Sequence, residues 1–111
     1  MTGSDIAARL ELESVQSAGG KREIVTGYTS DLLSDVMAHA EEGAVLITIQ
    51  AHKNTIAVAS LAGCPAIIVC NERPIPEEMI EAAKQEEIAI YSTGANQFET
   101  SGKLYALLGQ G

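Results

Sequence analysis

Aromatic residues are scarce in this chain of 111 residues, which contains no Trp, one Phe and three Tyr. Because 46% of the residues are nevertheless hydrophobic, the core has to be built mainly from Ile, Val, Leu and Ala. That composition is typical of a close-packed α/β domain. The length suits one ordinary domain with a single core, spanning residues 1–111.

Positive charge is also scarce, since seven Lys and Arg residues face fifteen Asp and Glu residues and the formal net charge is −8. Nucleic-acid backbones and anionic membrane surfaces are bound by clustered Lys and Arg, so neither is an expected partner. No apolar run reaches the roughly 18 residues of a membrane span, and residues 1–14 lack the basic and apolar regions of a signal peptide. A cytoplasmic protein is therefore expected.

Complete catalytic motifs are missing as well. There is no GxxxxGK(S/T) phosphate loop, no GxGxxG dinucleotide loop and no GxSxG nucleophile elbow. His52 has no second His, Cys or acidic residue at metal-ligand spacing, so no metal site is predicted. The sequence favours a protein that is not an enzyme and that carries no cofactor.

The two cysteines, Cys64 and Cys70, lie near opposite ends of one predicted strand. At a rise of about 3.3 Å per residue, their positions are roughly 20 Å apart. A disulfide needs Cα atoms within about 7 Å, so these two cannot pair with each other. We expect both to be reduced and associated with the strand.

Strands and helices alternate through the second half of the chain. Residues 44–61 show the pattern most clearly, because an apolar strand at 44–49 leads through polar residues into an apolar helix. Further strands are predicted at 65–70 and 88–93, each followed by a helix. Right-handed crossovers turn this order into a mainly parallel sheet of about five strands between two layers of helices, a three-layer α/β/α fold.

Two more strands are predicted in the first half of the chain. Residues 11–15 and 22–28 alternate well enough to be strands, and Gly19 with Gly20 supplies a turn between them. They form either an N-terminal hairpin or a pair of edge strands. In both cases they are expected to extend the edge of the parallel sheet.

Helix starts and faces follow from capping residues and spacing. The residues expected to begin helices are Thr2 with Asp5, Thr29 or Ser30, Asn54, and Pro76. The helix after Ser30 is expected to bury the stripe Leu33, Val36, Met37 and Ala40. The last helix carries Phe98, Gly102, Tyr105 and Leu108 on one stripe, and Gly102 is expected to mark a close backbone approach.

The first candidate site is the segment TGYTSD at residues 26–31. Gly27 admits a close backbone approach, and a helix that begins near Ser30 would direct free N–H groups at an anion or phosphate. The alternative is an ordinary capped helix behind a turn. Asp31 is interpreted as a first-turn residue that the helix dipole stabilises, and Asp35 as a solvated one.

The second candidate site is Gln50, His52 and Asn54, which follow the strand at 44–49. Gln50 and His52 offer donors and acceptors of the kind that read a ribose, a base edge or a small anion, while Asn54 caps the helix. The alternative is that Gln50 and His52 merely satisfy loop carbonyls. Ligands of open α/β sheets gather beyond the carboxyl ends of the strands, where these residues are placed.

The third candidate site is the polar turn at residues 92–99, again at a carboxyl strand end, and an ordinary capped turn is again the alternative. Because the carboxyl ends of parallel strands share one edge, the three segments are expected to converge on one crevice. The candidate ligand-binding residues are Thr26, Gly27, Tyr28, Ser30, Asp31, Gln50, His52, Asn54, Thr93, Gly94 and Asn96.

Three segments of the sequence resemble the DRTGG domain family. They are SDLLSDVM (30–37), ITIQAHKNTIAVASL (47–61) and FETSGKLYALLG (98–109). The resemblance covers nearly the whole chain, and the middle segment is its most specific part. The DRTGG turn itself corresponds to EIVTG here, where only Thr26 and Gly27 match.

This resemblance implies a fold like the N-terminal domain of HPr kinase/phosphorylase, without the kinase's phosphate loop. It also implies a regulatory, interface-forming role, as in related domains inside some phosphotransacetylases and pyrophosphatases. Stand-alone versions of this length resemble proteins encoded beside iron-only hydrogenase components.

The leading hypothesis is a non-catalytic regulatory module that binds a small nucleotide-like or anionic ligand and works as a homodimer. The alternative is a structural adaptor that docks on a hydrogenase or redox-complex protein without a small ligand, with Tyr28 and Tyr105 as anchors. A third hypothesis is an enzyme in which Asp31 orients His52 as a general base.

Overall fold

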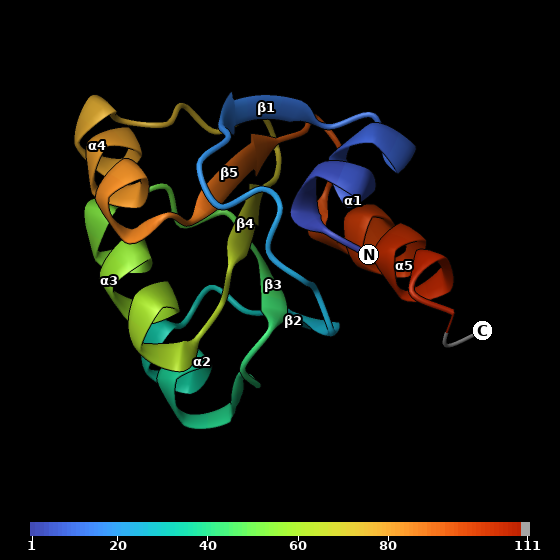
Figure 1. Ribbon diagram of the computed structural model, residues 1–111, viewed down its shortest axis with the longest axis horizontal. Helices are drawn as coiled ribbons and strands as arrows, with labels where there is room; N and C mark the ends of the chain where they lie inside the picture. Colours follow the sequence, from blue (N-terminus) through green and yellow to red (C-terminus); the bar gives the residue numbers. More distant parts are fainter. Residues whose placement is uncertain (110–111) are drawn as a thin grey trace.

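Five strands form one sheet in the order β1-β5-β4-β3-β2 in the computed structural model of the chain, which describes residues 1–109 (Figure 1). The strands are β1 (Glu13–Gln16), β2 (Thr26–Thr29), β3 (Ala44–Thr48), β4 (Ala66–Val69) and β5 (Ala89–Ser92). β2, β3, β4 and β5 are parallel, and β1 runs antiparallel to β5. The predicted, mainly parallel sheet is confirmed.

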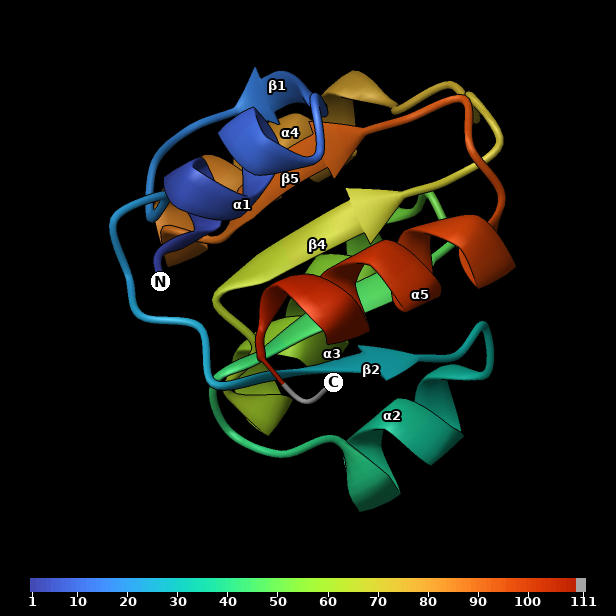
Figure 2. The same ribbon diagram turned by 90° about the vertical axis from the view of Figure 1, so that its right-hand side faces the viewer.

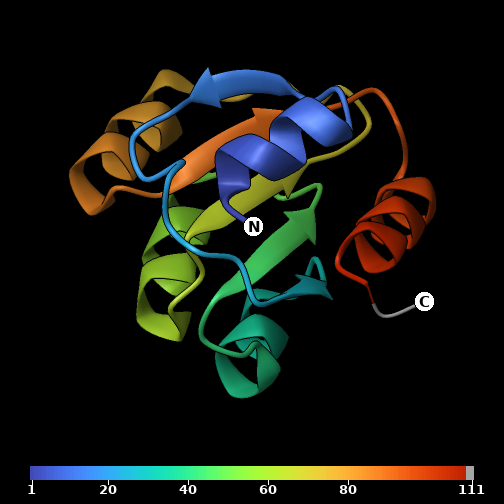
Figure 3. The same cartoon turned by 45° about the vertical axis from the view of Figure 1, so that its right-hand side comes forward.

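Helices cover both faces of this sheet. They are α1 (Gly3–Arg9), α2 (Leu33–His39), α3 (Lys53–Ala62), α4 (Glu77–Glu86) and α5 (Gln97–Leu107). α2, α3 and α4 lie on one face, and α1 and α5 lie on the other (Figures 2 and 3). The three-layer α/β/α arrangement is thereby confirmed. None of the helices within residues 1–109 is long and apolar enough to cross a membrane.

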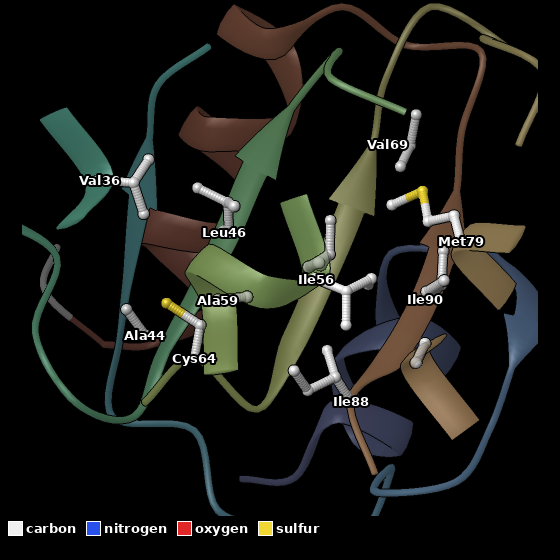
Figure 4. Close-up of a cluster of buried hydrophobic side chains, with 12 residues drawn as sticks. Val36, Ala44, Leu46, Ile56, Ala59, Cys64, Val69, Met79, Ile88 and Ile90 are labelled. Carbon is white, nitrogen blue, oxygen red and sulfur yellow. The ribbon is translucent and has the colours of Figure 1, made fainter. Parts of the chain in front are cut away.

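The three inner strands, β3, β4 and β5, supply side chains to two hydrophobic cores, one on each face of the sheet. Leu46 packs with Ile56 and Met79 beneath α2, α3 and α4 (Figure 4). Its neighbours Val45 and Ile47 point to the opposite face and pack with residues of α1 and α5. β3 and β4 are buried along their whole length because they are central and covered on both sides, which explains why all their residues except Thr48 are apolar.

The two strands of the first half lie at opposite edges of the sheet, so the edge-strand prediction is confirmed and the hairpin is wrong. Gln16 helps to hold β1 beside β5, because its buried side chain donates to the Ile88 carbonyl oxygen at 2.8 Å. The chain then crosses to the far edge, burying Ile24 on the way. β2 pairs with β3 there, with Thr26 opposite Ala44.

Helix starts differ from the prediction by one to three positions, except at α1. The capping box of Thr2 and Asp5 is present. α2 begins after Leu32, and no side chain caps that helix. The backbone N–H of Leu32 donates to the Ser30 hydroxyl oxygen at 3.2 Å. α3 is capped by His52 rather than Asn54, and α4 begins directly after Pro76.

The two faces of α5 also differ from expectation. Thr100 and Leu104 are buried, whereas Phe98 is 87% exposed and Tyr105 is 62% exposed. Gly102 makes no close approach within residues 1–109, because a Cβ atom added there would have no other heavy atom within 4 Å. The aromatic residues of α5 are therefore largely exposed and not buried against the sheet. On α2, Val36 is buried but Met37 is 51% exposed, so that predicted stripe is only partly buried.

Candidate functional site

Asp31 is the centre of a hydrogen-bond network at the carboxyl edge of the sheet. Its Oδ1 atom accepts from the Thr48 hydroxyl at 2.9 Å, the Ile49 amide at 2.9 Å and Gln97 Nε2 at 3.1 Å. Its backbone carbonyl accepts from Gln50 Nε2 at 2.9 Å. The loop after β2, the end of β3 and the start of α5 are thus joined at one point.

The Asp31 carboxylate sets the charge of this edge. It is half-buried, and its three donors are one hydroxyl, one amide N–H and one carboxamide, none of which carries a positive charge. A phosphate placed beside it would meet a like charge with no neutralising cation in the network. All three donors use Oδ1, and no hydrogen bond from within residues 1–109 reaches Oδ2. That oxygen can accept from a hydroxyl group of a ligand, as acidic residues do with ribose.

A hollow of about 200 Å³ lies beside this network, between β2 and α5. It is lined by Thr26, Gly27, Thr29, Ile47, Ser101, Leu104, Tyr105 and Leu108. Thr29 Oγ1 and Ser101 Oγ are 2.7 Å apart and join the strand to the helix at the hollow. Gln97 and Ser101 are one turn apart on α5, so the hollow lies next to the Asp31 network, although Asp31 and Gln97 are not among its lining residues.

Gly27 lies within strand β2 rather than in a turn before a helix. A Cβ atom at this position would come within 2.8 Å of Leu104 Cδ2. The glycine therefore allows α5 to lie close to the edge strand. From the sequence, Gly27 is expected to let a ligand approach the backbone, but the group that approaches it is Leu104 of α5.

Tyr28 points to the other face of the sheet. Its hydroxyl donates to Asp35 Oδ2 at 2.7 Å, and His39 Nδ1 lies 3.0 Å from Asp35 Oδ1. The hydrogen bond from Tyr28, followed by Ser30 and then His39, lowers the pKa of Asp35, and the same bond raises the pKa of Tyr28. The interpretation of Asp35 as merely solvated is wrong, because the carboxylate holds α2 to β2.

His52 and Asn54 serve the start of α3. His52 Nδ1 accepts from the Asn54 amide at 3.0 Å and thereby acts as the helix cap. Both side chains are exposed, and Asn54 lines the groove between α3 and α4 instead of the hollow beside α5. Within residues 1–109, no hydrogen bond joins His52 to Asp31, the pair that an enzyme would need.

The third segment forms a capped turn. Thr93 Oγ1 accepts from the Ala95 amide, and Asn96 caps α5 through a reciprocal pair of bonds with Glu99. Gly94 packs beside Glu72, whose Oε2 atom would lie 3.0 Å from an added Cβ atom. These groups satisfy local backbone donors, which matches the simpler of the two interpretations. Gln97 is the residue of this segment that reaches the other two.

The two thiols lie on opposite faces of the sheet. Cys64 belongs to the core under α2, α3 and α4, and Cys70 to the core under α1 and α5. Both are free and buried, as predicted, and burial raises the pKa of each. Within residues 1–109, no group of three His, Cys, Asp or Glu side chains is placed to hold a metal ion.

Comparison with known proteins places this fold in a family. Residues 35–108 match the profile of the family described as HPr Serine kinase N terminus. The chain belongs to this family. The match begins inside α2, so it covers Gln50, His52, Asn54 and Gln97 but not the segment at 26–31. No curated protein gives a significant match.

Among solved structures, this member of the HPr Serine kinase N terminus family is similar to a regulatory region from Clostridium perfringens. The structure is that of the CBS and DRTGG domains of the regulatory region of a pyrophosphatase, complexed with the activator diadenosine tetraphosphate. The TM-score is 0.72 at 18% identity, and the alignment covers 96% of this chain and 46% of the other. The chain thus spans less than half of that structure, and the likeness confirms the DRTGG fold.

The sequence did not single out three residues of this site. Thr48, Gln97 and Ser101 all make hydrogen bonds there. Thr48 carried a usable signal, since it is a polar residue buried inside an apolar strand. Gln97 lies within the predicted segment at 92–99, but its contact with Asp31 depends on the path that α5 takes across β2. Ser101 carried no signal, because its role depends on the same path.

Proposed function

We propose that this chain is a non-catalytic regulatory module that binds the nucleoside part of a small nucleotide-like ligand beside α5 and works as a homodimer. The observation that carries the proposal is the Asp31 network, which gathers the ends of β2 and β3 and the start of α5 beside a hollow. The hydroxyls of Thr29 and Ser101 lie in the lining of that hollow. Hydroxyl and carboxylate groups of this kind recognise ribose and base edges.

The size and charge of the site favour a nucleoside over a phosphate. A volume of about 200 Å³ is below the roughly 300–1,000 Å³ of pockets that enclose drug-sized ligands. One base or one ribose fits, with the ring of Tyr105 available to contact it. Any phosphate would extend outward, away from the negative charge of Asp31. The volume and the charge of the hollow therefore favour the uncharged nucleoside part of a nucleotide-like ligand over its phosphate groups.

The pyrophosphatase region supports the same proposal by analogy of fold. That regulatory region was complexed with diadenosine tetraphosphate, a ligand that carries two adenosine groups. We propose an adenosine-containing compound as the first ligand to test on this chain. The comparison concerns another protein, and the residues that would bind here are those of the α5 site.

The homodimer is supported by the outer face of α5. Phe98 and Tyr105 are exposed on that face, with Gly102 between them. The absence of a side chain at Gly102 leaves room for a second helix to approach closely. Large aromatic side chains bury about 150–250 Å² each when they are covered, so this stripe is a strong candidate for self-association.

Binding can be tested by thermal unfolding and calorimetry with adenosine, AMP, ATP and diadenosine tetraphosphate. A ligand at ten times its Kd stabilises the folded state by about 1.4 kcal/mol, which raises the Tm by several degrees in a domain of this size. Ser101→Ala should weaken that effect, and Ser34→Ala, an exposed serine on α2, should not. The proposal would be overturned if none of the four compounds raised the Tm or gave a binding heat at millimolar concentration.

The aromatic stripe also favours the second candidate, an adaptor that docks on a hydrogenase or redox-complex protein. Tyr105 is exposed enough to be an anchor, whereas Tyr28 is half-buried and bonded to Asp35. The adaptor should retain its protein partner in a pull-down when Gln50 and His52 are both changed to Ala. It should lose that partner when Phe98 and Tyr105 are both changed to Ala.

A further inference from the structure

A groove on the opposite side of the molecule has no part in the site described above. It lies between α3 and α4 and has a volume of about 760 Å³. Its lining consists of Lys53, Asn54, Ile56, Ala57, Ser60, Leu61, Glu77, Glu78, Glu81, Ala82, Gln85 and Glu86. The two helices lie side by side on the face away from α5 (Figure 1). From these features we infer that the groove is a docking site for a basic amphipathic helix of a partner protein.

The apolar part of the groove accounts for an amphipathic occupant. Ala57 and Ala82 are small and leave the space between the helices open. Leu61 is 75% exposed at the groove, a high value for a leucine on the helix layer of a closed domain. Aliphatic side chains at helical spacing can enter such a channel, which is the helix-in-groove mode of recognition.

The charge of the groove accounts for a basic occupant. Four glutamates line it, and Lys53 is its single lysine or arginine. Lys53 lies 3.9 Å from Glu78, and the Ser60 hydroxyl donates to Glu86 at 2.8 Å. Glu77 and Glu81 are exposed residues of the lining, and Glu81 lies 3.9 Å from Lys84 of the same helix. Their carboxylates are available to Lys or Arg side chains that flank an apolar stripe. The carboxylates are exposed, so they set specificity and association rate more than affinity.

The dimensions suit a short helix. α3 and α4 have ten residues each, so each is roughly 15 Å long at about 1.5 Å per residue. A partner segment of about three turns would match that length. A second copy of this chain that docked through its own α3 and α4 is a poor occupant, because it would bring a second set of glutamates against the four that line the groove.

The test uses a synthetic amphipathic peptide of Leu and Lys with leucines at i, i+3, i+4 and i+7, and a matched peptide in which Glu replaces Lys. Calorimetry at low salt and NMR shift mapping on the whole chain are the measurements. We expect the Lys peptide to bind with shifts concentrated in α3 and α4, and the Glu peptide not to bind.

Matched variants separate the groove from general attraction to an acidic protein. Glu77→Gln with Glu81→Gln should weaken binding about fivefold, the size expected for two exposed charge contacts. Glu11→Gln with Glu13→Gln removes the same charge from exposed positions just before and at the start of β1 and should change affinity less than about twofold. Leu61→Ser should also weaken binding, and because Leu61 is mostly exposed that variant should fold.

Several results would overturn the inference. They are an equal loss of affinity in both pairs of glutamate variants, shifts that map to α5 instead of α3 and α4, and a Leu61→Ser variant that binds as well as the native chain. Self-association that the Leu61→Ser change abolishes would identify a second copy as the occupant and would equally reject a basic partner.

Discussion

Leu104 lies against Gly27, so close that a Cβ atom on residue 27 would come within 2.8 Å of Leu104 Cδ2. This contact seats the middle of α5 on the edge strand β2. Leu104 is 2% exposed, so its side chain has little room to move away. The position of the whole helix therefore depends on the absence of a side chain at residue 27.

The contact predicts an energetic coupling between the two positions. Leu104→Ala should destabilise the fold by about 2–5 kcal/mol, as for other buried leucines. Gly27→Ala should cost about 1 kcal/mol or more in the native chain, because it overpacks this site. In the Leu104→Ala background the added methyl group should be tolerated, giving a coupling of about 0.5–3 kcal/mol. Urea unfolding of the four chains measures the cycle, and simple additivity would contradict the close contact.

Asp31 should be needed for stability as well as for any ligand. Asp31→Ala leaves the Thr48 hydroxyl, the Ile49 amide and Gln97 Nε2 without their shared acceptor. Loss of an acceptor from partly buried donors costs about 1–3 kcal/mol. Asp31→Asn keeps an acceptor oxygen and should cost less. The prediction fails if chemical denaturation finds the two variants equally stable.

The hydrogen bond from Tyr28 to Asp35 predicts a loss of stability in acid. Because the folded pKa of Asp35 is depressed, its contribution is present above its unfolded value of about 3.9 and disappears as the pH falls through the lower folded value. In that window the unfolded chain binds more protons than the folded chain, so stability decreases with decreasing pH.

Tyr28→Phe removes the largest cause of the Asp35 shift. Unfolding curves collected from neutral pH to below about pH 3 should therefore show a smaller acid-induced loss in the variant than in the native chain. Ser14→Ala, which changes an exposed residue of β1, is the control. Identical pH profiles of native chain and Tyr28→Phe would show that Asp35 is not linked to folding through Tyr28.

The buried thiols should react slowly in the folded protein. Burial raises the pKa of Cys64 and Cys70, and the thiolate is the reactive form. A chromogenic disulfide reagent should modify both residues rapidly in denaturant and slowly under native conditions. Rapid native modification of either thiol would be inconsistent with its burial.

Gly102 should separate folding from self-association. Gly102→Ala should stabilise the folded chain by about 0.5–1 kcal/mol, because alanine is the better helix former and nothing in the chain lies close to it. If α5 meets a second α5 at this residue, the same change should weaken the dimer. Thermal unfolding under monomeric conditions measures the change in stability. Sedimentation equilibrium, which gives the molecular mass, measures the change in self-association. Unchanged self-association would place the dimer contact elsewhere.

The inner strands of the sheet were predicted well because strands that are buried on both faces have almost wholly aliphatic sequences. β3 and β4 are covered on both faces, and their residues are almost all aliphatic. The hairpin was wrong for the converse reason. β1 and β2 are both partly exposed strands, and an alternating pattern does not tell which neighbour a strand will pair with.

The site was predictable only in part. Asp31 and Gln50 were identified from their place after parallel strands, and they do lie together. The partnership of Asp31 with Gln97 joins residues that are 66 positions apart, and it depends on how α5 crosses the sheet. The stripe of Phe98 and Tyr105 misleads for a related reason, since its spacing shows only that the two residues share a face of the helix.

One helix, α5, carries both the proposed ligand-binding surface and the proposed dimer surface. Its inner side holds Gln97 against Asp31, Ser101 against Thr29 and Leu104 against Gly27. Its outer side presents Phe98 and Tyr105 to solvent. Because a single α-helix moves nearly as a rigid body, a protein bound to Phe98 and Tyr105 that shifts α5 also shifts Gln97 relative to the Asp31 carboxylate. Protein binding on one side of α5 and ligand binding on the other would then be coupled through this helix.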